Sequence, residues 1–488
     1  MTHSNLSRRN FMGVTAGTLA CAGLAADAAP PKTEVSALSL RREVPVSRPY
    51  DVVVCGGGPS GVAAALAARR CGLEVLVIES QGQLGGNATS GLVSHWLGGR
   101  TSDCRRWVVG GLFKEFSEEA AKRDIALIPS PDPTKQYQPH GWYKGQLAAG
   151  IPLDPFRMAT YLDEKMAEAG VPVLFFSQVV EPILEGGRIT HVLVSNKNGL
   201  TAVPATVVID ATGDADVAAR SGCDFILGRD EDGLMTPTSL TFHVDHVDQE
   251  ALSGYIHKHT SPRFRDKVKK LRKAGEWPFP YDIFISVQLD QPGTMMINTT
   301  RLVGIDGTDT ASLSEGMARG RQEIEQLMAA MRKHFPGFEK VRLKAVAPCL
   351  GVRETRRLRT EQMLTVKDLN QGRDFEDTIG YSAYGWDLPD PKRPSDNPGH
   401  GKKRPVTPIP YRIMVPGKIP NLICPGRAVS VERPVLGPLR VMAPCMAMGE
   451  AAGQAAAECV REGVSFGQVD TDRLRTQLAQ QGAILEWA

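Results

Sequence analysis

The hydrophobic positions near residue 50 follow the pattern of a buried strand, a tight turn, a helix and a second buried strand. Residues 50–55, YDVVVC, are rich in β-branched side chains, which is typical of a strand buried on both faces. A glycine-rich turn and an alanine-rich stretch of helical composition come next, and a second apolar run fills residues 73–78. A dinucleotide-binding site requires its elements in this order.

The turn after the first strand carries the glycine pattern G-x-G-x-x-G. Gly56 permits a tight turn, Gly58 lets a pyrophosphate approach the backbone, and Gly61 lets the helix lie close to the strand. The N-terminus of that helix directs its free N–H groups at the phosphates. Glu79 ends the second strand, where a carboxylate accepts hydrogen bonds from a ribose hydroxyl group. The first predicted cofactor-binding residues are Gly56, Gly57, Gly58, Pro59, Ser60, Gly61, Glu79 and Ser80.

Helical and strand patterns alternate along the rest of the chain. Residues 111–121 and 154–169 have helical patterns, and Gly170 ends the second helix. Four runs, at 171–176, 179–184, 188–196 and 201–205, alternate apolar and polar residues with glycine-containing turns between them, which predicts a small antiparallel β-meander. The remaining predictions are a buried strand at 207–210, a helix at 315–334, an irregular loop at 386–408, a strand at 421–424 and a small-residue helix at 444–461.

These elements predict an α/β fold with two interwoven domains. A Rossmann-like cofactor domain of three layers, with a parallel sheet and the β-meander, carries an inserted mixed α+β substrate domain. The predicted cofactor domain comprises 49–99, 154–222 and 415–465, and the predicted substrate or cap domain comprises 100–153 and 223–414. Residues 29–48 are predicted to be a linker, and residues 466–488 a helical C-terminal tail.

The first 28 residues have the form of a twin-arginine export signal. Arg8 and Arg9 precede a modest apolar stretch at 14–25, and small residues follow it. The stretch is too short and too weakly hydrophobic for a stable membrane span. We expect residues 1–28 to direct export through the twin-arginine translocase to the periplasm, while a disordered basic tail is the alternative.

Composition and cysteine spacing exclude several other classes. The chain of 488 residues has a formal net charge of only +3, which argues against nucleic acid as a main partner. Nine cysteines are present, but none forms a C-x-x-C pair, which argues against a dithiol reductase and a metal cluster. We expect those beyond the leader to be buried small hydrophobic residues, although an exported protein can still form disulfides.

Three blocks of sequence resemble one family. They are GGGPSGVAAALAARRCGLEVLVIE from residue 56, VVIDATGDADVAARSG from residue 207, and NLICPGRAVSVERPVLGPLRVMAPCMAMGEAAGQAAA from residue 421. Together they resemble the FAD-dependent oxidoreductases of the glutathione-reductase-like superfamily with two dinucleotide folds. The resemblance extends from residue 50 to the C-terminus and implies FAD as the cofactor, while it gives no substrate.

The resemblance also implies roles for further residues. A second glycine loop would wrap the pyrophosphate and the flavin edge, the strand at Val179 would bond the adenine, and the turn after residue 210 would pass under the FAD. That turn contains acids that could instead be simple turn residues. Gly426 and Arg427 would meet the ribityl and phosphate region, and the helix near Pro444 would point its N-terminus at the flavin. The residues implied are Gly85, Gly86, Asn87, Ala88, Thr89, Val179, Ala211, Thr212, Gly213, Asp214, Gly426, Arg427, Ala443 and Met446.

Three residues are candidates for the chemistry. His95 follows the glycine loop and could be an acid or base, a point of covalent flavin attachment, or a solvated loop histidine. Arg353 and Arg440 could clamp an anionic substrate or balance the reduced flavin, because a guanidinium group forms paired hydrogen bonds with carboxylates. Arginine in a polar run is also often structural.

The expected function is that of an exported flavoenzyme that oxidises or reduces a small organic molecule by hydride transfer at flavin N5. Only one dinucleotide fingerprint is present, so we expect electrons to be exchanged with a quinone, a cytochrome, oxygen or a soluble carrier, rather than with NAD(P)H. One alternative is a reductase of unsaturated acids that resembles fumarate reductases. Another is a flavin-binding protein without redox activity.

Overall fold

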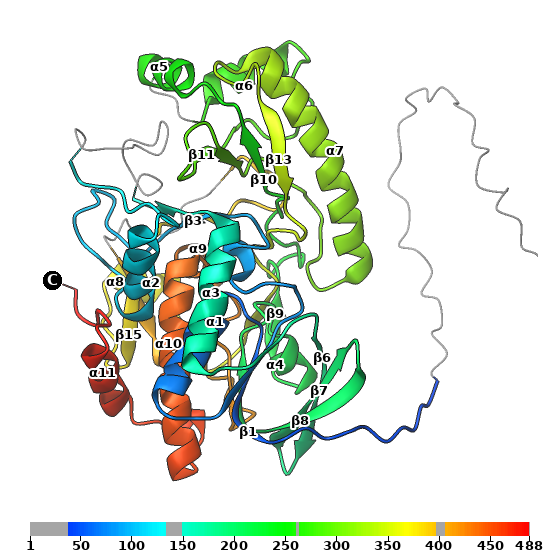
Figure 1. Ribbon diagram of the computed structural model, residues 1–488, viewed down its shortest axis with the longest axis vertical. Helices are drawn as coiled ribbons and strands as arrows, with labels where there is room; N and C mark the ends of the chain where they lie inside the picture. The colour runs from blue at the N-terminus through cyan, green and yellow to red at the C-terminus, as the bar shows by residue number, and fades with distance from the viewer. Residues whose placement is uncertain (1–37, 133–148, 260–262, 397–405, 488) are drawn as a thin grey trace, which may run out of the picture. The chain divides into compact units, whose positions relative to one another are not determined.

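The first strand of the chain lies in the middle of a seven-stranded sheet, with helices on one face. The computed structural model describes residues 38–132, 149–259, 263–396 and 406–487, and residues 44–488 form one compact unit (Figure 1). The sheet has the order β5-β2-β1-β8-β7-β6, and β17 also pairs with β8. Its strands are β1 (Tyr50–Cys55), β2 (Val75–Ile78), β5 (Val173–Leu174), β6 (Gln178–Glu185), β7 (Arg188–Asn196), β8 (Gly199–Asp210) and β17 (Leu422–Ile423).

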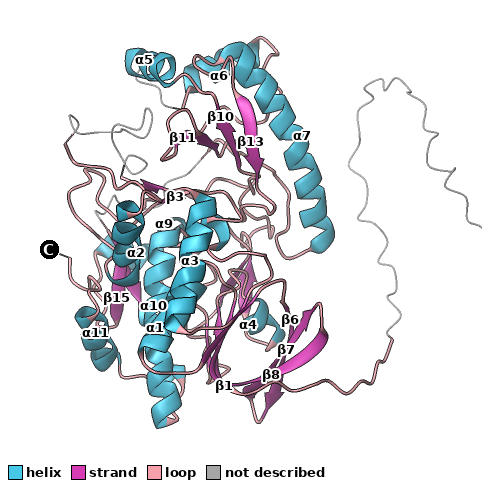
Figure 2. Cartoon of the chain, viewed as in Figure 1, coloured by secondary structure: helices cyan, strands magenta, loops and turns pink. Residues whose placement is uncertain are grey.

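Alternation of side chains along the strands produces the three layers. Val52 and Val54 of β1 pack toward the helices, whereas Val53 and Cys55 pack toward β6, β7 and the short helix α4 (Asp216–Arg220). The helical layer is α1 (Pro59–Arg70), α2 (Gly111–Lys122), α3 (Pro155–Ala169), α10 (Met442–Glu462) and α11 (Thr471–Gln480) (Figure 2). This arrangement confirms the predicted Rossmann-like α/β fold.

Two features of the meander differ from prediction. Residues 171–176 do not belong to it, because Val173–Leu174 pair in parallel with β2 and Phe176, at φ +50°, turns the chain away. The runs at 201–205 and 207–210 are one strand, β8, since the alternation of buried Val203, Ala205 and Val207 continues without a break. The early part of β8 is antiparallel to β7, and its later part is parallel to β1 and β17.

A second, four-stranded antiparallel sheet has its own hydrophobic core. Its order is β11-β12-β10-β13, and aromatic residues such as Phe264, Phe284 and Phe335 fill the core beside it. The strands are β10 (Phe242–Asp245), β11 (Ser286–Gln288), β12 (Met295–Ile297) and β13 (Arg342–Val346), and the helices are α5 (Gln249–His259), α6 (Arg265–Lys273) and α7 (Thr310–His334). Figure 1 shows this sheet beyond the ends of α1, α3 and α10. The domain boundaries given above stay predictions.

Three short pairs of strands and two further helices lie outside the two sheets. These are β3 (His95–Trp96) with β4 (Ile151–Pro152), β9 (Phe225–Leu227) with β14 (Arg356–Leu358), β15 (Thr378–Ser382) with β16 (Thr407–Pro410), α8 (Val366–Gln371) and α9 (Arg433–Leu439). The last two residues of the predicted loop at 386–408 therefore belong to a strand, β16, and part of the loop lies outside the described residues. The cysteines at 55, 71, 104, 223, 349, 424, 445 and 459 are all free thiols, and most are buried.

Candidate functional site

The three motif glycines of the first turn occupy different surroundings. Gly56 has φ +106°, and a Cβ atom there would lie 2.4 Å from the carbonyl oxygen of Ala211. A Cβ on Gly61 would lie 1.8 Å from the carbonyl oxygen of Gly56, so α1 packs directly on the turn. A Cβ on Gly58 would meet no atom within 4 Å. Only Gly58 faces open space, and it does so at the N-cap of α1, which has no side-chain cap. The turn therefore fits a bound pyrophosphate.

Glu79 lies beside this turn at the carboxyl end of β2. It is buried, and its Oε2 atom accepts a hydrogen bond of 2.7 Å from the backbone N–H of Gly57. Its Oε1 atom accepts hydrogen bonds from the N–H of Gln81 at 2.6 Å and from the hydroxyl of Ser80 at 3.3 Å. The carboxylate is thereby held where the sequence places the ribose contact.

The second glycine loop folds onto the first. The N–H of Gly85 donates to the carbonyl oxygen of Gly57 at 2.9 Å, and a Cβ on Gly86 would lie 3.0 Å from the Cα of Gly58. Both Gly85 and Gly86 have positive φ. Ala88 and Thr89 are buried, whereas Asn87 lines a cavity described below. The two loops thus form a continuous wall of backbone from the open space at Gly58 to that cavity.

Arg427 is engaged in a network that joins three segments. Its Nε donates to the carbonyl oxygen of Gly213 at 2.9 Å, and its Nη2 pairs with Asp214 at 2.5 Å. Its Nη1 donates to the carbonyl oxygen of Val352. These contacts hold the turn that contains Ala211, Thr212, Gly213 and Asp214, so Arg427 positions this turn. Its predicted contact with the cofactor stays a prediction.

Asp210 and Val179 also have partners in the protein. Asp210 accepts hydrogen bonds from Thr212 and from the backbone N–H of Ala218, as a turn acid does. The carbonyl oxygen of Val179 accepts a hydrogen bond of 3.3 Å from Arg220. The predicted adenine contact of Val179 is untested.

Helix α10 begins two residues earlier than predicted and points its N-terminus into the cavity. Val441 is its N-cap, and Val441 and Met442 line the cavity. Pro444 is tolerated as the third helical residue because the first N–H groups of a helix have no intrahelical partner. Ala443 and Met446 are buried in the hydrophobic core, and their predicted contacts with the cofactor stay predictions. The N-cap residue Val441 has no side-chain cap.

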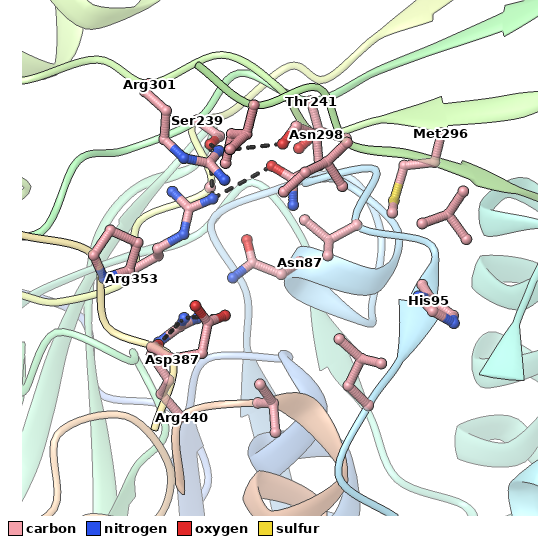
Figure 3. Close-up of a pocket in the computed structure, with 18 of the residues that line it drawn as sticks. Asn87, His95, Ser239, Thr241, Met296, Asn298, Arg301, Arg353, Asp387 and Arg440 are labelled. Atoms are coloured by element: carbon pink, nitrogen blue, oxygen red, sulfur yellow. Dashed lines mark hydrogen bonds and ion pairs between the residues drawn. The ribbon is translucent and has the colours of Figure 1, made fainter. Parts of the chain in front are cut away.

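The cavity lies between the glycine loops, the start of α10 and the four-stranded sheet (Figure 3). Its apolar wall includes Val93, Leu97, Ile285, Val287 and Met296. Its polar side gathers Arg301, Arg353 and Arg440, with Arg263 and Arg265 also in the lining. Among the described residues that line the cavity, Asp387 is the single acidic side chain.

Arg353 and Arg301 lie next to each other on the side of the second sheet. Arg353 donates to the carbonyl oxygen of Pro237 at 2.6 Å, to the hydroxyl oxygen of Ser239 at 2.8 Å and to Asn298 Oδ1 at 3.3 Å. Arg301 donates to the same Ser239 oxygen at 3.1 Å. Burial, followed by the charges of Arg301 and Arg440, lowers the pKa of Arg353 well below its ordinary value. Burial likewise lowers the pKa of Arg301.

Arg440 faces this pair from the end of α9 and is tied to Asp387. Its Nη2 donates to the carbonyl oxygen of Asp387 at 2.6 Å and lies 3.4 Å from Asp387 Oδ2. Tyr384 donates to Asp387 Oδ2 at 2.5 Å. Burial would raise the pKa of Asp387, but the Arg440 charge and the Tyr384 hydroxyl outweigh it, so the pKa lies below its ordinary value. Asp387 is therefore ionised at neutral pH.

His95 is not a solvated loop residue. It lies in β3, is 1% exposed and borders the cavity, because β3 pairs with β4 beneath the glycine loop. Its roles as an acid or base and as a point of covalent flavin attachment stay predictions.

His243 of β10 is also buried, contacts the carbonyl oxygen of Leu92 at 3.0 Å, and has a pKa lowered by burial to about 4. The neutral imidazole is thus part of the packing between the second sheet and the glycine loop.

The structure brings together all three residues predicted for the chemistry and adds others. His95, Arg353 and Arg440 all border the cavity. Sequence reasoning missed Arg301, Tyr384 and Asp387, which belong to no motif. The only available signal was that they follow or precede short strands in segments rich in proline and glycine, and that signal identifies no particular residue.

Comparison with known proteins identifies a family and several partial relatives. The family model of the FAD dependent oxidoreductases matches residues 51–478. Digeranylgeranylglycerophospholipid reductase 2 of Methanopyrus kandleri is 28% identical over 166 residues, which are 34% of this chain and 37% of the reductase. The digeranylgeranylglycerophospholipid reductase of Methanoculleus marisnigri is 28% identical over 184 residues, 36% of this chain and 42% of that protein. The matched segments thus span less than half of either reductase.

One solved structure with a similar course of the chain is the p-nitrophenol 4-monooxygenase of Pseudomonas putida. It has a TM-score of 0.47 and 15% identity, and the match covers 86% of this chain and 82% of the monooxygenase. The family match, together with the glycine turn that fits a pyrophosphate, identifies FAD as the cofactor. The chain belongs to the FAD dependent oxidoreductase family.

Proposed function

We propose that this protein transfers a hydride between a small organic substrate and N5 of FAD, and that the substrate binds in the cavity between α10 and the four-stranded sheet. The observation that carries the proposal is that one short loop joins the glycine turn to the cavity. A Cβ on Gly86 would lie 3.0 Å from the Cα of Gly58, and the next residue, Asn87, lines the cavity together with the start of α10. A dinucleotide that extends from the glycine turn would therefore reach the cavity with its flavin end.

The residues of the chain supply orientation and electrostatics. The free N–H groups at the start of α10 favour negative charge on the nearest part of the cofactor, which helps the reduced form of a flavin. The apolar part of the lining, at Ile285, Val287 and Met296, would exclude water from the cavity when the substrate is bound. When bound, FAD would supply the hydride acceptor or donor.

Export and the electron partner are further parts of the proposal. The twin-arginine pattern in residues 1–28 lies outside the described residues, and its form supports passage through the twin-arginine translocase. Within the described ranges, no helix has the length and hydropathy of a membrane span. We propose a quinone, a cytochrome, oxygen or a soluble carrier as the electron partner, because the chain has one dinucleotide fingerprint.

The absorbance spectrum of the purified protein tests the proposal directly. We expect flavin bands, which acid precipitation moves to the supernatant if FAD is held without a covalent bond. Flavin in the acid pellet would support attachment through His95. Anaerobic addition of hydroxy acids, amines, sugars and alcohols should then bleach the flavin with one class of substrate. Protein that cannot be reconstituted with FAD would contradict the proposal.

A reductase of unsaturated acids is the second candidate, and the arginine group favours it. Such an enzyme requires arginines that bind substrate carboxylates and donate a proton, and Arg301, Arg353 and Arg440 share one cavity. Oxidation of a reduced viologen dye by unsaturated acids, but not by their saturated counterparts, would support this candidate. Bleaching of the oxidised flavin by a saturated substrate would support the first.

A further inference from the structure

We propose that the substrate carries a carboxylate and that Arg301 and Arg353, with Arg440 opposite them, bind it. This inference rests on the proposed function, because it assigns the chemical class of the molecule that occupies the same cavity. It applies to either direction of hydride transfer.

The first argument is the imbalance of charge. Arg301, Arg353 and Arg440 all line the cavity, and Asp387 is the single acidic residue among the described residues of its lining. Asp387 is already engaged by Arg440 and Tyr384. A buried charge without a counter-ion is costly, so a cavity with an excess of arginine is suited to an anion.

The second argument concerns the partners of the guanidinium groups. Arg301 is 5% exposed, and its acceptors are neutral oxygens of Ser239, Asn298 and Thr300. Its Nε and the Nε of Arg440 are buried and have no hydrogen-bond partner within the described part of the chain. Neutral acceptors hold Arg301 in place without neutralising its charge. Arg440 is paired with Asp387, but its buried Nε–H group is still a donor that a ligand could use.

The third argument is that Arg301 and Arg353 are held by the second sheet and not by the part of the protein that is predicted to bind the cofactor. Every acceptor of Arg301 and Arg353 belongs to residues 237–300, the segment that forms most of the second sheet. The start of α10 lies on the other side of the cavity (Figure 3). A molecule whose anion is bound by Arg301 and Arg353 would therefore lie between the second sheet and the start of α10.

The apolar part of the lining restricts the rest of the molecule. Val287 of β11 and Met296 of β12, together with Val93 and Ile285, give the same cavity an apolar surface. A planar guanidinium group matches a carboxylate with two parallel hydrogen bonds. The combination favours an organic acid with an apolar body over a sugar or a polyphosphate.

Titration of the holoenzyme with benzoate and benzamide tests this inference. The two probes share a ring and nearly the same size, but only benzoate is charged. Binding is followed by the change in flavin absorbance. We expect saturable benzoate binding that is at least about tenfold tighter than benzamide binding, the factor that corresponds to losing one charged hydrogen-bond partner.

Variants assign the effect to the arginines. Arg353→Met and Arg440→Met should each weaken benzoate binding at least about tenfold and leave benzamide binding unchanged. Arg353→Lys, which keeps the charge but not the paired donors, should fall between the wild type and Arg353→Met. Arg319→Met is the matched control, because Arg319 lies on α7, pairs with Glu315 and does not line the cavity.

Three results would overturn the inference. They are equal binding of benzoate and benzamide, wild-type benzoate affinity in the arginine variants, and loss of FAD from Arg353→Met, which would assign Arg353 to the cofactor. If Arg353→Met does not fold, wild-type benzoate affinity in both Arg353→Lys and Arg440→Met has the same meaning. A flavin bleached only by neutral substrates would contradict the carboxylate while leaving the hydride transfer intact, whereas protein without flavin would contradict the proposed function itself.

Discussion

The two sides of the candidate site are built on opposite principles. On the side of the glycine turn, backbone contacts determine the geometry, and Gly56 and Gly61 leave no room for a side chain. On the side of the second sheet, long charged side chains determine it, and Arg301 and Arg353 share a single hydroxyl group. The first side can accept only a ligand of fixed shape, whereas the second selects its ligand by charge.

This difference explains why the glycine side of the site can be recognised from a sequence motif, whereas the arginine side cannot. A backbone cradle needs particular glycines at fixed spacing, so it leaves a motif. A charged wall needs only that arginines from distant segments meet in the folded protein, and residues 301, 353 and 440 are separated by about fifty to ninety positions. The sequence motif therefore indicates the cofactor, whereas the arginines that support our proposal for the substrate come together only in the folded protein.

The largest effect should come from adding one carbon atom to Gly61. Gly61→Ala places Cβ 1.8 Å from the Gly56 carbonyl oxygen, where neither backbone segment can yield without displacing the turn. We expect the free energy of unfolding to fall by about 3 kcal/mol or more. Gly254→Ala in α5 is the control, since its Cβ meets no atom within 4 Å and a helical alanine should be neutral or stabilising. Denaturant unfolding of both variants measures the difference.

Gly58→Val should separate cofactor binding from folding. The Cβ of residue 58 meets no protein atom within 4 Å, so the unfolding free energy of the apoprotein should change by less than about 1 kcal/mol. The added side chain occupies the space assigned to the pyrophosphate, so the purified variant should lack FAD. Normal FAD occupancy would show that the pyrophosphate lies elsewhere.

Glu79→Ala should weaken FAD binding without abolishing it. The carboxylate supplies a charged hydrogen-bond acceptor, whose removal costs roughly 1 to 3 kcal/mol of binding free energy. Glu79→Gln keeps an acceptor for the Gly57 N–H and should lose less. Titration of the apoproteins with FAD, followed by flavin fluorescence, compares the three affinities. If both variants bind FAD as tightly as the wild type, a residue other than Glu79 contacts the ribose.

Asp387→Asn should strengthen benzoate binding, whereas the arginine variants should weaken it. Removing the single carboxylate of the described lining leaves Arg440 without its charged partner, so benzoate should bind about 1 kcal/mol more tightly. FAD content should stay unchanged. Weaker benzoate binding in Asp387→Asn would indicate that Asp387 holds Arg440 in its binding position and that this role outweighs the change in charge.

The main features of the fold were predictable from the sequence because they depend on local pattern. β1 agrees with its predicted run to the residue, and the helix predicted at 154–169 is α3, capped by Asp154 and ended by Gly170. The meander was partly wrong, since a two-residue strand such as β5 takes its direction from β2 and not from its own composition. Tyr384 and Asp387 could not be found, because their position beside Arg440 depends on tertiary contacts alone.

The close packing of α1 and α10 has a consequence for how the protein is made. A Cβ on Gly449 would lie 2.0 Å from the Ser60 carbonyl oxygen, and one on Gly453 would lie 2.2 Å from that of Ala64. The helix that carries the glycine turn thus finds its partner nearly 400 residues later in the chain. The ribosome must therefore release the chain through α10 before the cofactor site can close, and FAD can be fully enclosed only after that helix has been made. An export route that accepts folded proteins would suit this late assembly.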